Sequence, residues 1–208
     1  MATGEPLKLG VLASGRGTNL QSILDAIAKG ELVAEVKLVV CNHRGAQAIE
    51  RARAAGVPVE ICERASFESR SSQHRAIMAR LDEVGVDLVV CAGWDRVLDD
   101  EVARRFAGRI INVHPALLPS FGGGLHAIRD ALEYGVKITG CTVHFVTEAL
   151  DQGPIIAQAA VRVLPGDTEE TLGDRIHREE HRLLVEAIRD YSRGRLQVTG
   201  RTVTLKNG

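Results

Sequence analysis

Hydrophobic and polar positions in the first half of the chain follow two alternating periods. Short apolar runs that suit buried strands are separated by segments with apolar residues at helical spacing. Strands are expected at 7–13, 36–41, 57–61, 86–91 and 110–113, and helices at 19–28, 46–55 and 70–84. Strands that alternate with helices predict parallel pairing through right-handed crossovers. We therefore expect an α/β fold with a Rossmann-like, mostly parallel twisted sheet and helices on both faces.

The pattern changes in the last third of the chain. Two longer apolar stretches flank the loop 147–153, which is typical of a hairpin rather than of a helical crossover. A long amphipathic run follows, with Asp167 or Thr168 as its N-cap and Gly194 just beyond its end. The expected elements are strands at 137–146 and 154–163, a helix at 168–192 and an edge hairpin at 196–205. They predict a mixed or antiparallel C-terminal extension of the sheet.

Length and composition are those of a globular protein. The 208 residues fit one domain, and 45% of them are hydrophobic and 25% charged. A net charge of -1 lacks the basic excess of a protein that binds nucleic acid. No signal-like stretch opens the chain, and no apolar run approaches the length that spans a membrane. We expect small-molecule partners, no nucleic acid and no membrane, and a monomer or homodimer.

The four cysteines are widely scattered along the chain. They are Cys41, Cys62, Cys91 and Cys141. No Cys-x-x-Cys pair and no histidine cluster has the spacing of zinc ligands. We expect small buried thiols, no metal, and a reduced, cytoplasmic location.

A neutral amide and an imidazole leave the fifth expected strand together. Asn112 and His114 stand two residues apart, so both side chains point to the same face, and Pro115 ends the strand. In an open α/β sheet, ligands bind at the carboxyl ends of the strands. An amide N–H that stabilises an oxyanion and an imidazole that moves a proton suit acyl or formyl transfer. Taken alone, however, Asn-x-His-Pro is more typical of a strand that ends in a capped turn.

Glycines follow the first expected strand, in the segment Ser14-Gly15-Arg16-Gly17-Thr18-Asn19. They permit close backbone approach, and the N–H groups at the start of the next helix suit a phosphate. The Lys of a P-loop and the third glycine of a dinucleotide fingerprint are missing, and the second strand ends without an acidic residue for a ribose. The segment favours a single phosphate ester over NAD, and a plain tight turn fits it equally well.

Two further loops hold candidate residues. Asp151 lies between two expected strands, where a carboxylate is often only a turn former. If this loop folds over the end of the fifth strand, Asp151 would hold the tautomer of His114 and raise its pKa. The segment 93–98 follows the fourth strand, where Trp94 with Val97 and Leu98 suits a slot for a flat heterocycle and Arg96 suits a ligand clamp. Packing under a loop and a surface charge are the commoner fates of such residues.

Taken together, five motifs resemble the phosphoribosylglycinamide formyltransferase family. They are Ser14-Gly15-x-Gly17-x-Asn19, Ala92-Gly93 ahead of Arg96, Asn112-x-His114-Pro115-x-Leu117-Leu118-Pro119, Thr142-x-His144 and Leu150-Asp151-x-Gly153-Pro154. Their order and spacing match over nearly the whole chain. The Asn-x-His-Pro-x-Leu-Leu-Pro element with the later Asp is specific to folate-dependent formyltransferases, while the glycine loop and the length favour the member from the purine pathway.

The resemblance implies a formyltransferase fold and a step of de novo purine biosynthesis. The formyl group of the co-substrate 10-formyltetrahydrofolate would pass to the glycine amine of glycinamide ribonucleotide by direct attack, without a covalent enzyme intermediate or a metal. Asn112 would stabilise the tetrahedral oxyanion, His114 would donate and relay the proton, and Asp151 would raise the pKa of His114 and order a water. His144 is implied as a supporting residue, although a structural role on its strand fits equally well.

The resemblance also assigns binding residues to the two substrates. Residues 1–113 would form a nucleotide-binding half of a single domain, 1–208, and residues 114–208 a half with the folate site, the active site and the long C-terminal helix. The phosphate and ribose of the ribonucleotide would contact Gly17, Thr18, Asn19, His177 and Glu180. Folate would contact Arg70, Asp95, Arg96, Val97, Leu98, Asn112, Thr147, Glu148, Ala149, Leu150 and Asp151.

The chain departs from the family pattern at several places. His177 stands where Gln or Lys is usual, Asp95 where many relatives carry Met, and Trp94 where Phe or Tyr is common. The glycines at 122–124 lengthen a loop by one residue and should make it more mobile. Side-chain packing around the pterin would change, while backbone contacts to it would survive.

Other functions fit part of the pattern. A formyltetrahydrofolate deformylase shares the Asn, His and Asp but delivers water, and it normally carries an N-terminal regulatory domain, for which too few residues precede the first strand. A methionyl-tRNA formyltransferase normally has a basic C-terminal domain that this chain lacks. A non-catalytic nucleotide-binding module would use the glycine loop and leave Asn112 and His114 structural.

Overall fold

The computed structural model describes residues 5–206. Backbone contacts divide the chain into two compact units, of which the first ends at Ile111 and the second begins at Asn112. The boundary lies within β5 (Ile110–His114), two residues before the division that the sequence suggests between its halves. A single domain over 1–208 stays a prediction.

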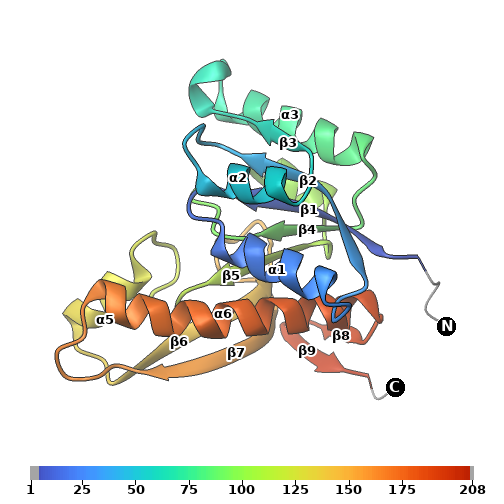
Figure 1. The fold of residues 1–208 in the computed structure, drawn as a ribbon. Coiled ribbons are helices and arrows are strands. Elements are labelled where there is room, and N and C mark those ends of the chain that lie inside the picture. The colour runs from blue at the N-terminus through green and yellow to red at the C-terminus, as the bar shows by residue number, and fades with distance from the viewer. Residues whose placement is uncertain (1–4, 207–208) are drawn as a thin grey trace. The chain divides into compact units, whose positions relative to one another are not determined.

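The first unit is a parallel α/β layer, coloured from blue to green in Figure 1. Its strands pair in the order β3-β2-β1-β4, each parallel to its neighbour. They are β1 (Leu7–Ala13), β2 (Ala34–Cys41), β3 (Val59–Ile61) and β4 (Leu88–Cys91). The helical segments are α1 (Thr18–Ala28), α2 (Gln47–Ala54), the 3-10 turn η1 (Arg64–Ser66), α3 (Arg70–Glu83) and α4 (Asp100–Arg105).

Burial explains why the central strands of this unit read as continuous apolar runs. Every residue of β4 is buried, and so are residues 9–13 of β1, because both faces of a parallel layer are covered. The register places Ala13 beside Cys41 and Leu12 beside Cys91. The three strands therefore end at one edge, and the polar segments that follow them begin there.

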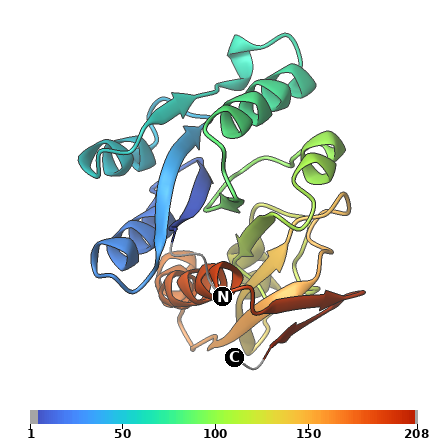
Figure 2. The same cartoon turned by 90° about the vertical axis from the view of Figure 1, so that its right-hand side faces the viewer.

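The second unit is a mixed sheet with strand order β5-β6-β7-β9-β8. Its later strands are β6 (Ile138–Phe145), β7 (Ile155–Arg162), β8 (Leu196–Thr199) and β9 (Thr202–Leu205). The pairs β6–β7 and β8–β9 are antiparallel, and Figure 2 shows the second of these hairpins in dark red, after the long C-terminal helix. The α/β class with a mostly parallel sheet and an antiparallel extension is confirmed.

The helices of this unit are α5 (Ala127–Tyr134) and α6 (Glu169–Ser192). Helix α6 packs along β6 and β7 (Figure 1) through an apolar stripe at helical spacing that includes Leu172, Ile176, Leu184 and Ile188, all fully buried. Thr168 is its N-cap and forms a capping box with Thr171. Asp167 instead pairs with Arg175, a contact that lowers the pKa of Asp167 to about 2.

The cysteines form no disulfide, and each is buried. Burial raises the pKa of Cys41 and Cys62 to about 11, and that of Cys91 and Cys141 to about 12. Within residues 5–206, no group of His, Cys, Asp and Glu side chains has the arrangement of a metal site. No helix of the same residues is long and apolar enough to cross a bilayer.

Candidate active site in the second unit

The turn after β5 is held by one buried hydroxyl from β6. Thr142 Oγ1 donates to the Ala116 carbonyl at 2.7 Å and accepts from the Leu118 N–H at 3.1 Å. Gln158 Nε2 on β7 donates to the same hydroxyl at 2.9 Å and to the Leu118 carbonyl at 3.0 Å. The segment that leaves β5 is therefore fixed by side chains of β6 and β7.

Asn112 is oriented by His144, which lies on β6. Its Nδ2 lies 3.2 Å from His144 Nε2, while His144 Nδ1 lies 2.9 Å from the Phe145 carbonyl. A carbonyl accepts only, so Nδ1 carries the proton and Nε2 accepts from the amide. Burial lowers the pKa of His144, which agrees with this neutral tautomer. One amide hydrogen of Asn112 is thus engaged, and the second is left to point toward a ligand.

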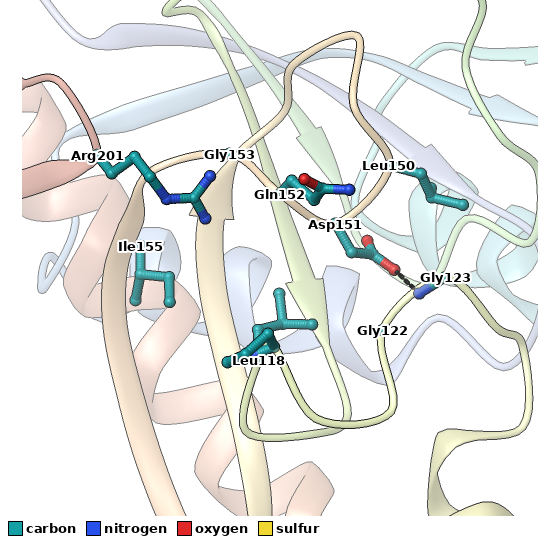
Figure 3. Close-up of a pocket in the computed structure, with 10 residues that line it drawn as sticks. Leu118, Gly122, Gly123, Leu150, Asp151, Gln152, Gly153, Ile155 and Arg201 are labelled. Carbon is teal, nitrogen blue, oxygen red and sulfur yellow. Dashed lines mark hydrogen bonds between the residues drawn. The ribbon is translucent and has the colours of Figure 1, made fainter.

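Asp151 belongs to the loop between β6 and β7 and faces two imidazoles. Its Oδ2 lies 3.7 Å from His114 Nδ1, and its Oδ1 lies 3.6 Å from His144 Nε2. Oδ2 also accepts from the Gly123 N–H at 2.8 Å, the bond that Figure 3 draws as a dashed line. The carboxylate is 10% exposed. It is therefore buried beside both rings, at ion-pair distance but beyond direct hydrogen bonding to either.

Backbone geometry explains how this loop reaches the end of β5. Asp151 has a φ of +53°, a left-handed conformation that a non-glycine residue adopts only when its surroundings hold it there. At Gly153, a Cβ atom would lie 1.8 Å from the Phe145 carbonyl oxygen, so only glycine permits this close packing against β6. The Leu-Asp-x-Gly-Pro motif thereby turns Asp151 inward.

The Nε2 atom of His114 contacts the loop that follows β5. His114 Nε2 donates to the Phe121 carbonyl at 2.9 Å, and Phe121 has a φ of +54°. The imidazole is 7% exposed. The ring is held at Nε2, with Nδ1 toward Asp151, and this contact was not foreseen from the sequence.

A pocket of about 550 Å³ lies beside Asp151 (Figure 3). Gly122 and Gly123 contribute to its wall on one side, and the turn between β8 and β9 contributes Arg201 on another. Its full lining is Leu118, Pro119, Gly122, Gly123, Leu150, Asp151, Gln152, Gly153, Ile155 and Arg201. The loop that carries Asp151 is thus accessible to a small molecule from this side.

In the first unit, the glycine segment leads into α1 as expected. Gly17 is the N-cap residue with a φ of +68°, and no side chain caps the helix. A Cβ at Gly17 would lie 2.7 Å from the Ala48 Cα, so α2 and this loop pack too closely for any other residue. Arg51 Nε donates to the Arg16 carbonyl at 2.8 Å and fixes the loop from α2. In general, the first N–H groups of a helix have no partner within the helix, which suits the binding of an anion.

The segment after β4, also in the first unit, is anchored by two carboxylates. Asp95 accepts from Asn42 and His43, and Asp99 pairs with Arg70 Nε at 2.6 Å. Asp99 also lies 3.1 Å from Nδ1 of the buried His74. Burial alone would raise the pKa of Asp99, but the charges of its neighbours and a Ser71 hydrogen bond lower it.

The remaining residues expected to bind substrates lie in both units. Val97 is 45% exposed, and Arg96 lies 3.6 Å from the Asp95 carboxylate. In the second unit, His177 and the buried Glu180 belong to α6, and residues 147–150 precede Asp151 in its loop. The structure brings together Asn112, His114, His144 and Asp151. The two expected substrate sets are divided between the units.

Fold and site together define a class of protein, an α/β enzyme that presents an amide, an imidazole and a carboxylate at the end of a strand. The chain belongs to the Formyl transferase family, whose match covers residues 7–188. This membership connects the site with the transfer of a one-carbon formyl group.

Individual relatives narrow the comparison. The chain is 48% identical over 200 residues to the phosphoribosylglycinamide formyltransferase of Mycobacterium tuberculosis (strain CDC 1551 / Oshkosh). This match covers 96% of this chain and 92% of that protein. It is 41% identical over 192 residues to the trifunctional purine biosynthetic protein adenosine-3 of Gallus gallus, of which it spans only 19%. The crystal structure of glycinamide ribonucleotide transformylase 1 from Symbiobacterium toebii superposes with a TM-score of 0.95 at 48% identity, over 99% of this chain and 96% of that one.

Proposed function

We propose that this protein transfers the formyl group of 10-formyltetrahydrofolate to the glycine amine of glycinamide ribonucleotide, a step of de novo purine biosynthesis. The observation that carries the proposal is the convergence of Asn112, His114 and Asp151 in one partly buried cluster of a Formyl transferase family member. The named activity of relatives that match the chain over most of both lengths supports this choice of substrates.

The reaction requires an oxyanion to be stabilised and protons to be moved. The amine attacks the formyl carbon, a C–N bond forms, and the carbonyl electrons move to oxygen. The second Nδ2 hydrogen of Asn112 can donate to that oxygen, because His144 accepts the first. The amine then loses a proton, the bond from carbon to the folate nitrogen breaks, and that nitrogen gains a proton. Overall, one proton passes from amine to leaving group.

His114 is the group that can carry this proton. It is the imidazole at the strand end, and Asp151 places negative charge 3.7 Å from its Nδ1. A carboxylate at this distance favours the protonated ring when His114 takes up the proton from the amine, and the ring can then return it to the folate nitrogen. Asp151 would also order a water near the reacting groups, as the family resemblance implies.

We assign the ribonucleotide phosphate to the glycine loop. Gly17, Thr18 and Asn19 present backbone N–H groups at the start of α1, where partial positive charge favours an anion. The assignment of His177 and Glu180 to the ribonucleotide stays a prediction. It can be tested independently, because amide exchange at 17–19 should slow when glycinamide ribonucleotide is added and should not respond to 10-formyltetrahydrofolate alone.

We assign the pterin of the co-substrate to the segment that contains Arg96, Val97 and Leu98, read mainly by backbone groups. Contacts from Arg70, Asp95, Asn112 and the loop residues 147–151 stay predictions. So do the cytoplasmic location and the choice between monomer and homodimer.

The function is tested by turnover with both substrates and with the co-substrate alone. We expect product only when the ribonucleotide is present, and a fall in kcat of about 100-fold to 10,000-fold in His114→Ala with the fold retained. Asp174→Asn on the exposed face of α6 is the control and should keep kcat within about twofold. Equal consumption of 10-formyltetrahydrofolate without ribonucleotide would identify a hydrolase instead, and unchanged kcat in His114→Ala would refute the role of the imidazole.

A further inference from the structure

The carboxylate of Asp95 collects hydrogen bonds from the ends of two other strands. Asn42 Nδ2 donates to its Oδ1 at 2.7 Å, and His43 Nε2 lies 2.8 Å from its Oδ2. Both residues follow β2 directly. The backbone of the same loop is bound to the residue after β1, because the Asp95 N–H donates to Ser14 Oγ at 2.9 Å and the Gly93 carbonyl accepts from the Ser14 N–H at 3.1 Å.

This cluster is partly buried and favours the ionised carboxylate. Asn42 is 5% exposed and Ser14 8%, while the carboxylate of Asp95 is 39% exposed. Partial burial would raise the pKa of Asp95, but the hydrogen bonds from His43, Asn42 and Ser14 outweigh it and lower the pKa. Arg96 adds a cation 3.6 Å from Oδ1. The carboxylate thus has a partner at each oxygen and no need of a ligand.

The loop is also anchored at its far end. Asp99, the N-cap residue of α4, pairs with Arg70 and lies against the buried His74 on α3. Between the two carboxylates stand Arg96, Val97 and Leu98, the residues to which the proposed function assigns the pterin. These three residues therefore lie between two anchored points. At the first, Asp95 accepts hydrogen bonds from Asn42 and His43, and at the second, Asp99 pairs with Arg70 and its N–H donates to His74 Nδ1.

We propose that Asn42, His43, Asp95 and Ser14 form a positioning cluster that sets the affinity for the formyl-folate co-substrate by holding the backbone of 96–98 in its binding conformation. The inference rests on the proposed function. Backbone groups bind a flat heterocycle with higher affinity when their loop is already ordered, because binding then carries no entropic cost of ordering the loop. His43 acts through the loop and not on the reacting atoms.

The cluster predicts separate effects on binding and on chemistry. His43→Ala should raise the KM for 10-formyltetrahydrofolate about threefold to tenfold, because the hydrogen bond it removes is charge-assisted but partly screened by solvent. Turnover at saturation should stay within about twofold, since Asn112, His114 and Asp151 are unchanged. His43→Gln retains a neutral donor and should restore most of the loss. The KM for the ribonucleotide should not change.

Amide exchange gives a readout that needs no turnover. In His43→Ala, the amides of 93–98 should exchange several-fold faster than in the unmodified protein, while those of β4 should not change. Arg44→Ala is the matched control, because Arg44 is the neighbouring residue but pairs with Glu63 instead of Asp95. It should leave both the exchange at 93–98 and the folate KM unaltered.

The outcomes separate the two proposals. Unchanged exchange at 93–98 in His43→Ala, or faster exchange without a rise in the folate KM, would overturn the positioning cluster. Failure of the unmodified protein to bind 10-formyltetrahydrofolate in a titration would refute the proposed function, whatever the exchange of the loop shows. Loss of fold in His43→Ala, seen by circular dichroism, would move the test to His43→Gln and Asp95→Asn, for which smaller effects of the same sign are expected.

Discussion

Asp95 in the first unit and Asp151 in the second are both loop carboxylates near the end of a strand, and their surroundings differ in kind. Asp95 is 39% exposed, yet it accepts close hydrogen bonds from Asn42 and His43. Asp151 is 10% exposed and, among residues 5–206, accepts one hydrogen bond, from the Gly123 N–H, while two imidazoles stand 3.6 and 3.7 Å away. The better buried carboxylate is the less satisfied one.

The difference distinguishes an acid that holds structure from one that is available for chemistry. The carboxylate oxygens of Asp95 accept hydrogen bonds from fixed donors, and these bonds stabilise the loop that carries Asp95. Asp151 accepts fewer hydrogen bonds, so its carboxylate can interact with a positive charge that forms on His114 only during the reaction. Its backbone is held in a left-handed conformation. Substitutions at the two sites should therefore affect different measured quantities.

Asp151→Asn should give the largest effect. The amide keeps the shape but cannot balance a protonated His114, so kcat should fall about 100-fold to 10,000-fold while both KM values change little. Steady-state kinetics with each substrate varied in turn will measure this. Thermal unfolding should show near-native stability, and a kcat within tenfold of the original would remove Asp151 from the proton path.

Thr142→Val tests the framework around Asp151 and should rank second. The isosteric change removes the hydroxyl that accepts from the Leu118 N–H and donates to the Ala116 carbonyl, and it leaves that N–H buried without its partner. The free energy of unfolding should drop by about 1–3 kcal/mol, measured by urea denaturation. Thr139→Val, at a buried hydroxyl with no hydrogen-bond partner within 5–206, is the control and should cost less. Equal losses would show that the turn after β5 does not depend on this hydroxyl.

Asp95→Asn should give the smallest effect, and a pH-dependent one. The pKa of Asp95 is lowered from its ordinary value of 3.8, so its contribution to stability is present above that pH and is lost as pH falls through the lower folded value. Solvent screens a group that is 39% exposed, so the free energies of unfolding of the variant and the unmodified protein should differ by less than about 1 kcal/mol at pH 7. This difference should become smaller below about pH 4, measured by urea denaturation at a series of pH values. A gap that widens toward acid would contradict the sign.

The local sequence pattern predicts much of the fold, and the two helices that it fails to predict share one feature. The strands of the parallel layer and the long helix α6 are marked by apolar periods that extend over whole elements. The sequence indicates no helix at 100–105 or 127–134, where the structure has α4 and α5. Helix α4 has only six residues. Helix α5 has eight residues, so its apolar pairs Ala127-Ile128 and Ala131-Leu132 complete only one helical repeat.

For the site as well, the sequence predicts features that depend on neighbouring residues, whereas contacts between distant segments are not predicted. That Asn112 and His114 leave one strand together follows from their spacing, and the glycine loop is visible beside them in the sequence. The approach of Asp151 depends on how a loop between two later strands packs, and only the family resemblance indicated it. The contacts of His114 with Phe121 and of Asp95 with His43 were missed. A usable signal for the latter existed, since Ser14, Asn42 and Gly93 each follow a parallel strand that ends at the same edge.

The buried thiols have a practical consequence. The pKa values of Cys41, Cys62, Cys91 and Cys141 lie at about 11 to 12, so almost no thiolate exists at neutral pH, and each of these residues is at most 3% exposed. A cysteine engineered on the surface would consequently be the sole fast-reacting group toward a maleimide dye. Fluorescent probes can be attached to chosen loops without first deleting any native sulfur.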